Sequence, residues 1–203
     1  MEDLFLIVGL GNPGADYATT RHNAGFSLVE RLAADWDCGW TAEKKFRARV
    51  AKAARRNGRV LLCEPQTFMN LSGETVGAMV GFYQLPLERL LVVLDDADLP
   101  AGTVRLRPGG SSGGHHGLES IEDHLASRNF ARLKIGIGRK ENLREITGHV
   151  LGRFDSAERE LMEQVLVRAA GQVETWLDAG IEKAMQLNGA LAPPTEKKET
   201  KKK

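Results

Sequence analysis

The sequence predicts an α/β fold: a single three-layer domain in which helices flank a mixed, mostly parallel β-sheet. Short apolar runs that are typical of buried strands alternate with segments whose apolar residues recur at helical spacing. An Asn-Gly pair between two strand-like runs adds one hairpin, and with it an antiparallel pair of strands. The chain has 203 residues, 42% of them hydrophobic, which suffices to bury the core of one such domain.

In the first half of the chain, each element follows from its local pattern. Residues 4–8 form an apolar, β-rich run, so we expect a buried strand there, followed by an amphipathic helix at 24–36. Residues 46–54 and 59–63 are the expected strands of the hairpin, which turns at Asn57-Gly58.

The same alternation continues in the second half. We expect a helix at 72–83 with Ser72 as its N-cap, although no capping-box acid follows three residues later. Residues 90–94 are continuously apolar, which predicts a central strand covered on both faces. The remaining expected elements are a strand at 103–107, a helix at 117–126, a strand at 132–137 and a helix at 156–187.

Composition excludes several classes of protein. The net charge of +1 gives no overall attraction to nucleic acid, so an RNA-binding surface must come from local clusters of basic residues. Cys38 and Cys63 show neither metal-type spacing nor a disulfide framework, which favours a cytoplasmic protein. Glu2 and Asp3 stand where a signal peptide would be basic, and no apolar run approaches the roughly 20 residues that span a bilayer.

The end of the chain differs in composition from the rest. Residues 191–203 are charged and lack apolar anchors, so we expect a disordered tail after a domain that spans residues 1–190. The tail could hold RNA electrostatically, but a solubilising role is the simpler interpretation.

A glycine-rich turn follows the first strand. Because ligands in open α/β sheets bind outside the carboxyl ends of strands, we expect residues 9–23 to line a site. The glycines of 9–14 match the dinucleotide-binding fingerprint. However, Pro13 removes an amide, the helix starts too late to support a phosphate, and Glu30 lies within the helical pattern rather than after a second strand. A tight turn is therefore the better interpretation.

Two residues could carry general-base chemistry. His22 lies on the loop after the first strand, and a neutral imidazole suits a base near neutral pH. Asp95 ends an apolar strand, and its carboxylate could fix the tautomer of the imidazole and stabilise the imidazolium. Taken alone, a loop histidine is usually solvated surface, and Asp95 could equally be a cap or turn residue.

Nucleophilic and metal-dependent routes find less support. The Gly-x-Ser-x-Gly motif is absent, and neither cysteine lies near a strand-end loop that contains histidine. His115 and His116 with Asp95 could suggest a metal site, but neighbouring side chains rarely converge on one ion, and no His-x-x-x-His spacing occurs. The residues thus favour a water molecule activated by histidine, with no metal and no cofactor.

Four segments, in this order, together resemble the bacterial-type peptidyl-tRNA hydrolases. The resemblance runs from about residue 4 to residue 190. The segments are Gly9-Leu10-Gly11-Asn12-Pro13-Gly14 with Tyr17 and Thr20-Arg21-His22-Asn23-Ala24-Gly25; Thr67-Phe68-Met69-Asn70-Leu71-Ser72-Gly73; Asp95-Asp96-Ala97-Asp98-Leu99-Pro100; and Gly113-Gly114-His115-His116-Gly117-Leu118.

The resemblance implies hydrolysis of the ester that links a peptide to the 3′-terminal ribose of tRNA. It implies that His22 activates water and that Asp95 orients and stabilises His22. Asn12 and Asn70 match the family's asparagines that hold the peptide and help to discriminate blocked from free aminoacyl-tRNA. Amide side chains suit this task because they donate and accept hydrogen bonds without adding charge.

Other positions are expected to contact tRNA by the same resemblance. Tyr17 and Phe68 match substrate-contacting positions, where aromatic rings could stack on the terminal adenosine. Arg107 and Lys134 match a pair proposed to clamp the 5′-phosphate, with lysine in place of the usual arginine. His116 stands where the family usually has asparagine. A neutral imidazole offers one donor where the amide offers two, so we expect retained activity with an altered rate or pH dependence.

The charged strands extend this expectation. Arg105 with Arg107, and Arg132 with Lys134, alternate so that each pair shares a strand face and could anchor tRNA phosphates. We therefore expect peptidyl-tRNA as the partner, no obligate protein partner and a monomer. The alternatives are a non-catalytic RNA-binding relative, for which His116 is the one hint, and a nucleotide-binding oxidoreductase, which rests on the glycines alone.

Overall fold

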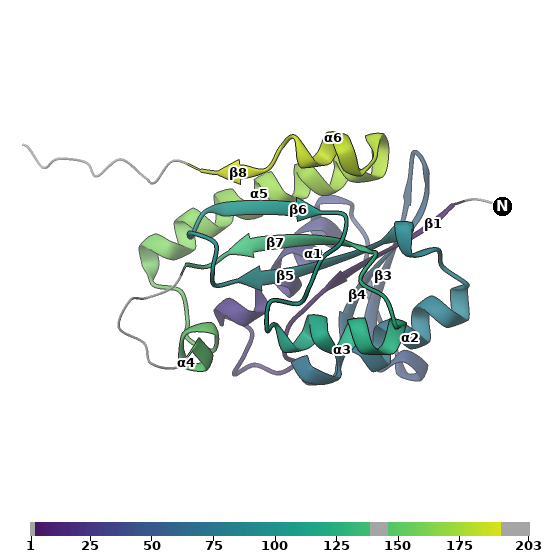
Figure 1. The fold of residues 1–203 in the computed structure, drawn as a ribbon, viewed down its shortest axis with the longest axis horizontal. Coiled ribbons are helices and arrows are strands. Elements are labelled where there is room, and N and C mark those ends of the chain that lie inside the picture. The colour runs from purple at the N-terminus through teal and green to yellow at the C-terminus, as the bar shows by residue number, and fades with distance from the viewer. Residues whose placement is uncertain (1–2, 139–145, 192–203) are drawn as a thin grey trace, which may run out of the picture.

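The computed structural model describes residues 3–138 and 146–191, which form an eight-stranded sheet flanked by helices (Figure 1). The strands are β1 (Leu4–Gly9), β2 (Trp40–Glu43), β3 (Ala48–Arg55), β4 (Gly58–Pro65), β5 (Leu90–Asp96), β6 (Thr103–Arg107), β7 (Ala131–Gly136) and β8 (Gly189–Ala190). The helices are α1 (Ala24–Asp35), α2 (Ser72–Tyr83), α3 (His116–Leu125), α4 (Ile146–Val150), α5 (Ser156–Ala179) and α6 (Ile181–Met185).

The sheet is mixed, as predicted, and its centre is parallel. The strand order is β2-β3-β4-β1-β5-β7-β6-β8, and the four central strands, β4, β1, β5 and β7, pair in parallel. Antiparallel pairs extend the sheet on both sides, through β3 and β2 at one edge and through β6 and β8 at the other. The carboxyl ends of the central strands therefore lie along the same edge of the sheet.

Alternation along the central strands divides the core into two layers. Ile7 packs with α1 and α5 on one face, whereas Leu6 and Val8 pack with α2 and α3 on the other. In Figure 1, α2 and α3 lie below the sheet, and α5 and α6 lie above it. This arrangement is the predicted three-layer fold, and its cause is the two-residue period of strand side chains.

Most predicted elements occur within one or two residues of their expected ends, and the hairpin turns at Asn57-Gly58. Two details of the prediction are wrong. The long helix breaks at Gly180, whose φ of +83° is unfavourable for other residues, and continues as α6. Ser72 is the first residue of α2 rather than its N-cap, and its hydroxyl donates to the carbonyl of Met69.

Several short elements have no clear signature in the sequence. These are β2, β8, α4 and four 3₁₀ helices, among them Arg21–Asn23 and Met69–Leu71. Both of these 3₁₀ helices lie in loops at the carboxyl edge of the sheet, where they set the positions of polar side chains.

The glycines after β1 serve close packing between β1 and α1. A Cβ atom on Gly9 would lie 2.3 Å from the carbonyl oxygen of Gly25, and one on Gly25 would lie 2.4 Å from the amide nitrogen of Leu10. A Cβ on Gly11 would lie 2.7 Å from the ring of Phe26. Close packing against α1 therefore explains why Gly9 and Gly11 are glycines, and no bound pyrophosphate is needed to explain them.

The predicted tail falls on residues that lie, apart from Leu191, outside the described part of the chain. Leu191 donates from its amide to the carbonyl of Gly102 at 3.0 Å. The division into a domain at 1–190 and a tail at 191–203 remains a prediction. Within residues 3–138 and 146–191, no helix has both the length and the apolar character that crossing a membrane requires.

Candidate active site

A cavity of about 540 Å³ opens at the carboxyl edge of the sheet. The 3₁₀ helix Arg21–Asn23 supplies His22, and the end of β5 supplies Asp95. His115 is the residue immediately before α3. The cavity brings together seven of the residues that the sequence predicts for the site: Asn12, His22, Phe68, Asn70, Asp95, His116 and Lys134.

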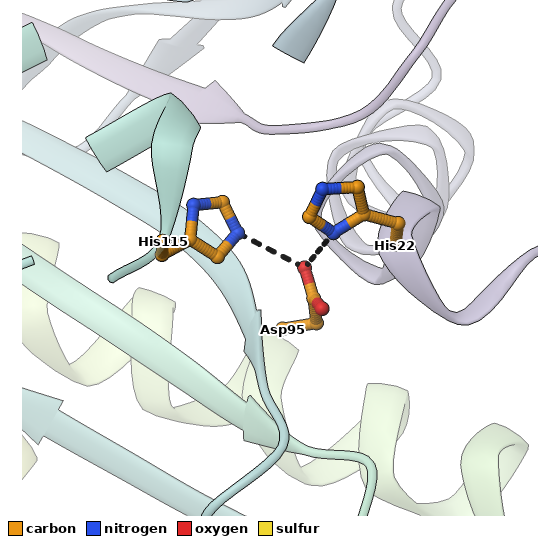
Figure 2. Close-up of side chains that lie close together, drawn as sticks. All are labelled: His22, Asp95 and His115. Carbon is orange, nitrogen blue, oxygen red and sulfur yellow. Dashed lines mark hydrogen bonds and ion pairs between the residues drawn. The ribbon is translucent and has the colours of Figure 1, made fainter. Parts of the chain in front are cut away.

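His22 and Asp95 form a hydrogen-bonded pair at the base of this cavity. Nδ1 of His22 lies 2.9 Å from Oδ1 of Asp95, whose side chain is 2% exposed. When Nδ1 carries the proton and donates it to the carboxylate, Nε2 keeps a free lone pair. Figure 2 shows this second ring nitrogen pointing away from Asp95. The geometry thus fixes the tautomer that a general base requires.

His115 is a site residue that the sequence reasoning missed, because it was considered only as a metal ligand beside His116. Its Nε2 lies 3.1 Å from the same Oδ1 of Asp95, so two imidazoles flank one carboxylate oxygen (Figure 2). Nδ1 of His115 accepts the backbone N–H of Leu118 at 3.3 Å, as the N-cap of α3. That contact leaves the proton on Nε2, which donates to Asp95. The position of His115 just before a helical pattern was the available signal.

The two donors determine the charge of Asp95. Burial by itself would raise the pKa of this carboxyl, but the hydrogen bonds and charge of His115 and His22 outweigh burial and hold the pKa well below its usual range. Asp95 is therefore a carboxylate at neutral pH. A buried negative charge next to His22 favours the imidazolium that forms when Nε2 takes a proton.

The same three side chains could also hold a metal ion. One ligand atom from each of His22, Asp95 and His115 lies within 4.8 Å of the other two. A metal would need the lone pairs of the ring nitrogens that face Asp95, whereas the contact between Leu118 and His115 leaves a proton on that nitrogen. The hydrogen bonds favour the metal-free arrangement, and the absence of a metal remains a prediction.

Asn12 also lines the cavity and is held by hydrogen bonds from two loops. Its backbone N–H donates to Oδ1 of Asn23 at 2.9 Å, and its carbonyl accepts from Nδ2 of Asn23 at 3.0 Å. The side-chain Oδ1 of Asn12 accepts the N–H of Met69 at 2.8 Å. Because Oδ1 is occupied, the side-chain Nδ2 is left as a donor for a substrate carbonyl.

The rim of the cavity is exposed. The side chain of Phe68 is 60% exposed, and Asn70 is exposed beside it. His116 lies at the start of α3 with its Nδ1 3.1 Å from Oε2 of Glu119. The hydrogen bond from His116 lowers the pKa of Glu119. These side chains are available to a large substrate.

The other residues predicted to contact tRNA lie in different surroundings. Nζ of Lys134 lines the cavity and lies 2.9 Å from Oδ2 of Asp96, so its charge is already partly compensated. Arg105 and Arg107 are exposed on β6, and Arg107 does not line the cavity. Tyr17 is half-buried and also lies outside the set of cavity-lining residues.

Arg132 is not an RNA anchor, and that part of the prediction is wrong. Its side chain is 1% exposed, and its Nη1 lies 3.0 Å from Oε1 of Glu122 and donates to the carbonyl of Gly110 at 2.6 Å. Strand alternation correctly places Arg132 on the face of Lys134, but the loop before α3 covers it. Here Arg132 ties that loop to the sheet.

The known proteins that this chain resembles agree with the interpretation of the cavity as an active site. Residues 6–198 match the family model described as "Peptidyl-tRNA hydrolase". The chain is 45% identical over 188 residues to a peptidyl-tRNA hydrolase of Gloeobacter violaceus, with 93% of this chain and 95% of that protein covered. It is 48% identical over 182 residues to one of Carboxydothermus hydrogenoformans, with 90% and 96% covered.

The fold agrees with a solved structure of the same kind. The crystal structure of peptidyl-tRNA hydrolase from Acinetobacter baumannii superposes with a TM-score of 0.87 at 40% sequence identity. The match covers 94% of this chain and 97% of that one.

Proposed function

Because the chain belongs to the peptidyl-tRNA hydrolase family, we propose that His22 is its general base and that Asp95 positions His22. The enzyme hydrolyses the ester bond between a peptide and tRNA, and it thereby releases free tRNA from prematurely dissociated peptidyl-tRNA. The residue assignment rests on one observation: Nδ1 of His22 meets a buried carboxylate at 2.9 Å, while His22 lines the cavity.

The proposed reaction needs one water molecule and one imidazole. Nε2 of His22 takes a proton as the water oxygen attacks the ester carbonyl carbon, and a tetrahedral intermediate forms. When the intermediate collapses, the bond to the ribose oxygen breaks and that oxygen receives the proton from the imidazolium. The products are a peptide with a free carboxyl group and tRNA with a free hydroxyl. Asp95 stabilises the imidazolium between the two proton transfers.

Asn12 and Asn70 are proposed to hold the peptide. Nδ2 of Asn12 is oriented by the contact with Met69 and can donate to a peptide carbonyl. A free aminoacyl group offers an ammonium in place of that carbonyl, and an N–H donor repels it. This difference in hydrogen bonding supports discrimination between blocked and unblocked aminoacyl-tRNA.

We propose that the tRNA end lies over the exposed rim, with Phe68 and Tyr17 near the terminal nucleotide and His116 beside the reacting group. Arg107 and Lys134 are the proposed phosphate contacts. The phosphate would have to compete with Asp96 for Lys134, so Arg107 is the more available cation. We further propose a cytoplasmic monomer that needs no protein partner, metal or cofactor.

The test measures release of tRNA from an N-acetylated aminoacyl-tRNA in the presence of a chelator. His22→Ala and Asp95→Asn should each lower kcat by about 10²- to 10⁴-fold, because a general base contributes about that much. His124→Gln is the matched control, since His124 lies on α3 and contacts the carbonyl of Ser120 instead of the cavity.

Turnover by His22→Ala within tenfold of the wild type would remove His22 from the mechanism. Loss of wild-type activity on chelation, with recovery on adding zinc, would instead assign the three-residue cluster to a metal. Binding of the substrate by the wild type without turnover would indicate a non-catalytic relative.

A further inference from the structure

A second pocket of about 210 Å³ lies against the loop that carries Asn12. Asn12 lines both this pocket and the catalytic cavity, so the two hollows meet at one residue. The rest of the lining comes from the turn after Asn12, from α1, and from the strands β3 and β4. None of the roles proposed above uses this pocket.

Glu64 is the unusual member of the lining. It lies near the end of β4 with a fully buried side chain. Its Oε2 accepts from Nη1 of Arg49 at 2.8 Å, whereas its buried Oε1 receives no hydrogen bond from a donor among the described residues, and the carboxyl of Glu30 lies close by. Buried polar atoms are nearly always satisfied, and an unsatisfied one is costly. An oxygen without a protein donor is satisfied either by a proton on the carboxyl or by a ligand that donates a hydrogen bond.

The charges of the pocket indicate the kind of donor. Glu30, on α1, also lines the pocket, and its Oε1 lies 3.8 Å from Nη1 of the same Arg49. Two carboxyl groups thus share one guanidinium, and their proximity helps to raise the pKa of Glu64. A proton or an ammonium group beside Glu64 completes the charge balance. Phe26, Ala15 and Ala18 supply apolar wall, which suits an alkyl chain that ends in a charge.

We propose that this pocket is a subsite for a primary ammonium group of the peptide, held by Glu64. The inference rests on the proposed function, in which Asn12 holds the peptide. A peptide bound across Asn12 extends from the catalytic cavity toward the second pocket. The residue that precedes the esterified one is the nearest source of an ammonium, either from a lysine side chain or from its own α-amine.

The test compares three dipeptidyl-tRNAs that share the same esterified residue and the same tRNA. In the first, the preceding residue is N-acetyl-lysine with a free side-chain amine; in the second it is N-acetyl-norleucine; in the third it is norleucine with a free α-amine. Norleucine keeps the alkyl chain and removes the side-chain charge. The first and third substrates distinguish the two sources of ammonium.

We expect the wild type to show a five- to tenfold higher kcat/KM for at least one ammonium substrate than for N-acetyl-norleucine. Glu64→Gln, which keeps the shape and an acceptor for Arg49, should abolish this preference and leave the N-acetyl-norleucine rate within twofold. That unchanged rate also reports correct folding. Glu74→Gln is the matched control, because Glu74 pairs with an arginine, Arg47, outside both hollows.

Equal rates for all three substrates in the wild type, or a preference that survives in Glu64→Gln, would overturn the subsite while leaving the proposed function intact. Absence of release from every substrate in the wild type would overturn both together.

Discussion

Two buried carboxyl groups lie at the same edge of the sheet, and their surroundings move their pKa values in opposite directions. Asp95, on β5, receives two imidazole N–H groups on one oxygen. Glu64, on β4, receives one guanidinium on one oxygen and no protein donor on the other, and its contact with the carboxyl of Glu30 raises its pKa. Burial raises the pKa of Glu64 to about 7, whereas the donors hold the pKa of Asp95 well below its usual range.

Both carboxyls are buried, so the difference comes from their neighbours: two imidazole donors at Asp95, against one guanidinium and a second carboxyl at Glu64. Asp95 is ionised before any substrate arrives, and it can therefore orient His22 and stabilise the imidazolium. Glu64 has one oxygen without a protein donor and a pKa raised to about 7, which suits a carboxyl that binds either a proton or an ammonium ligand. The comparison makes three predictions, which run from the largest expected effect to the smallest.

Removing the charge of Glu64 tests its side of the comparison. The unfolded chain releases this proton near pH 4.3, but the folded protein keeps it until about pH 7, so Glu64 contributes stability at low pH that is lost as the pH rises between these values. Glu64→Gln lacks this loss. Relative to the wild type, its free energy of unfolding should rise by on the order of 1–3 kcal/mol between about pH 4 and pH 8.

Urea unfolding across that pH range measures this difference. The titration involves the charged groups that face Glu64, namely Arg49 from β3 and Glu30 from α1. Glu74→Gln is the control for removing a carboxyl outside both hollows. A constant difference between Glu64→Gln and the wild type at every pH would contradict the raised pKa.

Removing one of the two hydrogen-bond donors to Asp95 tests the other half of the comparison. In His115→Asn, asparagine retains the N-cap of α3 but is too short to replace the imidazole contact with Asp95. The pKa of Asp95 should move up toward its ordinary value, and kcat should fall about tenfold with KM unchanged, because the contact with His22 remains.

The dependence of the free energy of unfolding on pH separates a positioning role of His115 from a loss of packing. The contribution of Asp95 to stability is present above its unfolded pKa of about 3.9 and is lost as the pH falls toward the folded value. His115→Asn should therefore lose less stability than the wild type on acidification. A parallel loss in both proteins, or a change in KM alone, would argue against a positioning role for His115.

The smallest effect is expected where the same pair of groups is exposed. His116 and Glu119 repeat the imidazole–carboxylate contact at 3.1 Å on the solvent side of the cavity. His116→Asn should raise the pKa of Glu119 toward its ordinary value, since the hydrogen bond from His116 is the main cause of its lowering. We expect kcat/KM to change by less than about threefold, because solvent screens the exposed pair and the asparagine amide can still hydrogen-bond to the substrate.

Carbon NMR of the glutamate carboxyl groups and steady-state kinetics measure the two parts of this prediction. A change in kcat/KM above tenfold would contradict this expectation and show that imidazole and amide are not equivalent at position 116.

Local patterns were sufficient for most of the fold because they depend on neighbouring residues in the chain. The continuous apolar run at 90–94 predicted a central strand, and the Asn57-Gly58 turn predicted the hairpin. Gly180 was not recognised as a helix break, since an isolated glycine in a helical pattern is often tolerated. The two-residue strand β8 carries too few residues to show any period.

The site was predictable only as far as its residues lie in motifs. His22 and Asp95 were chosen for their chemistry and for the resemblance, and they lie together as that choice requires. His115 was judged by its neighbour His116, but the start of α3 turns the two side chains to different partners. Arg132 was judged by alternation, which gives the face of a strand and not what covers that face.

The sequence by itself determined the order of helices and strands, the strand faces and the residue types available for acid–base chemistry, because these depend on periods of two and 3.6 residues within one segment. The tertiary structure decided which side chains meet: two histidines on one carboxylate oxygen, a covered arginine, and a buried glutamate with one oxygen that has no protein donor. Such meetings join loops that are far apart in the chain, and their geometry follows from strand order and helix packing rather than from any local pattern.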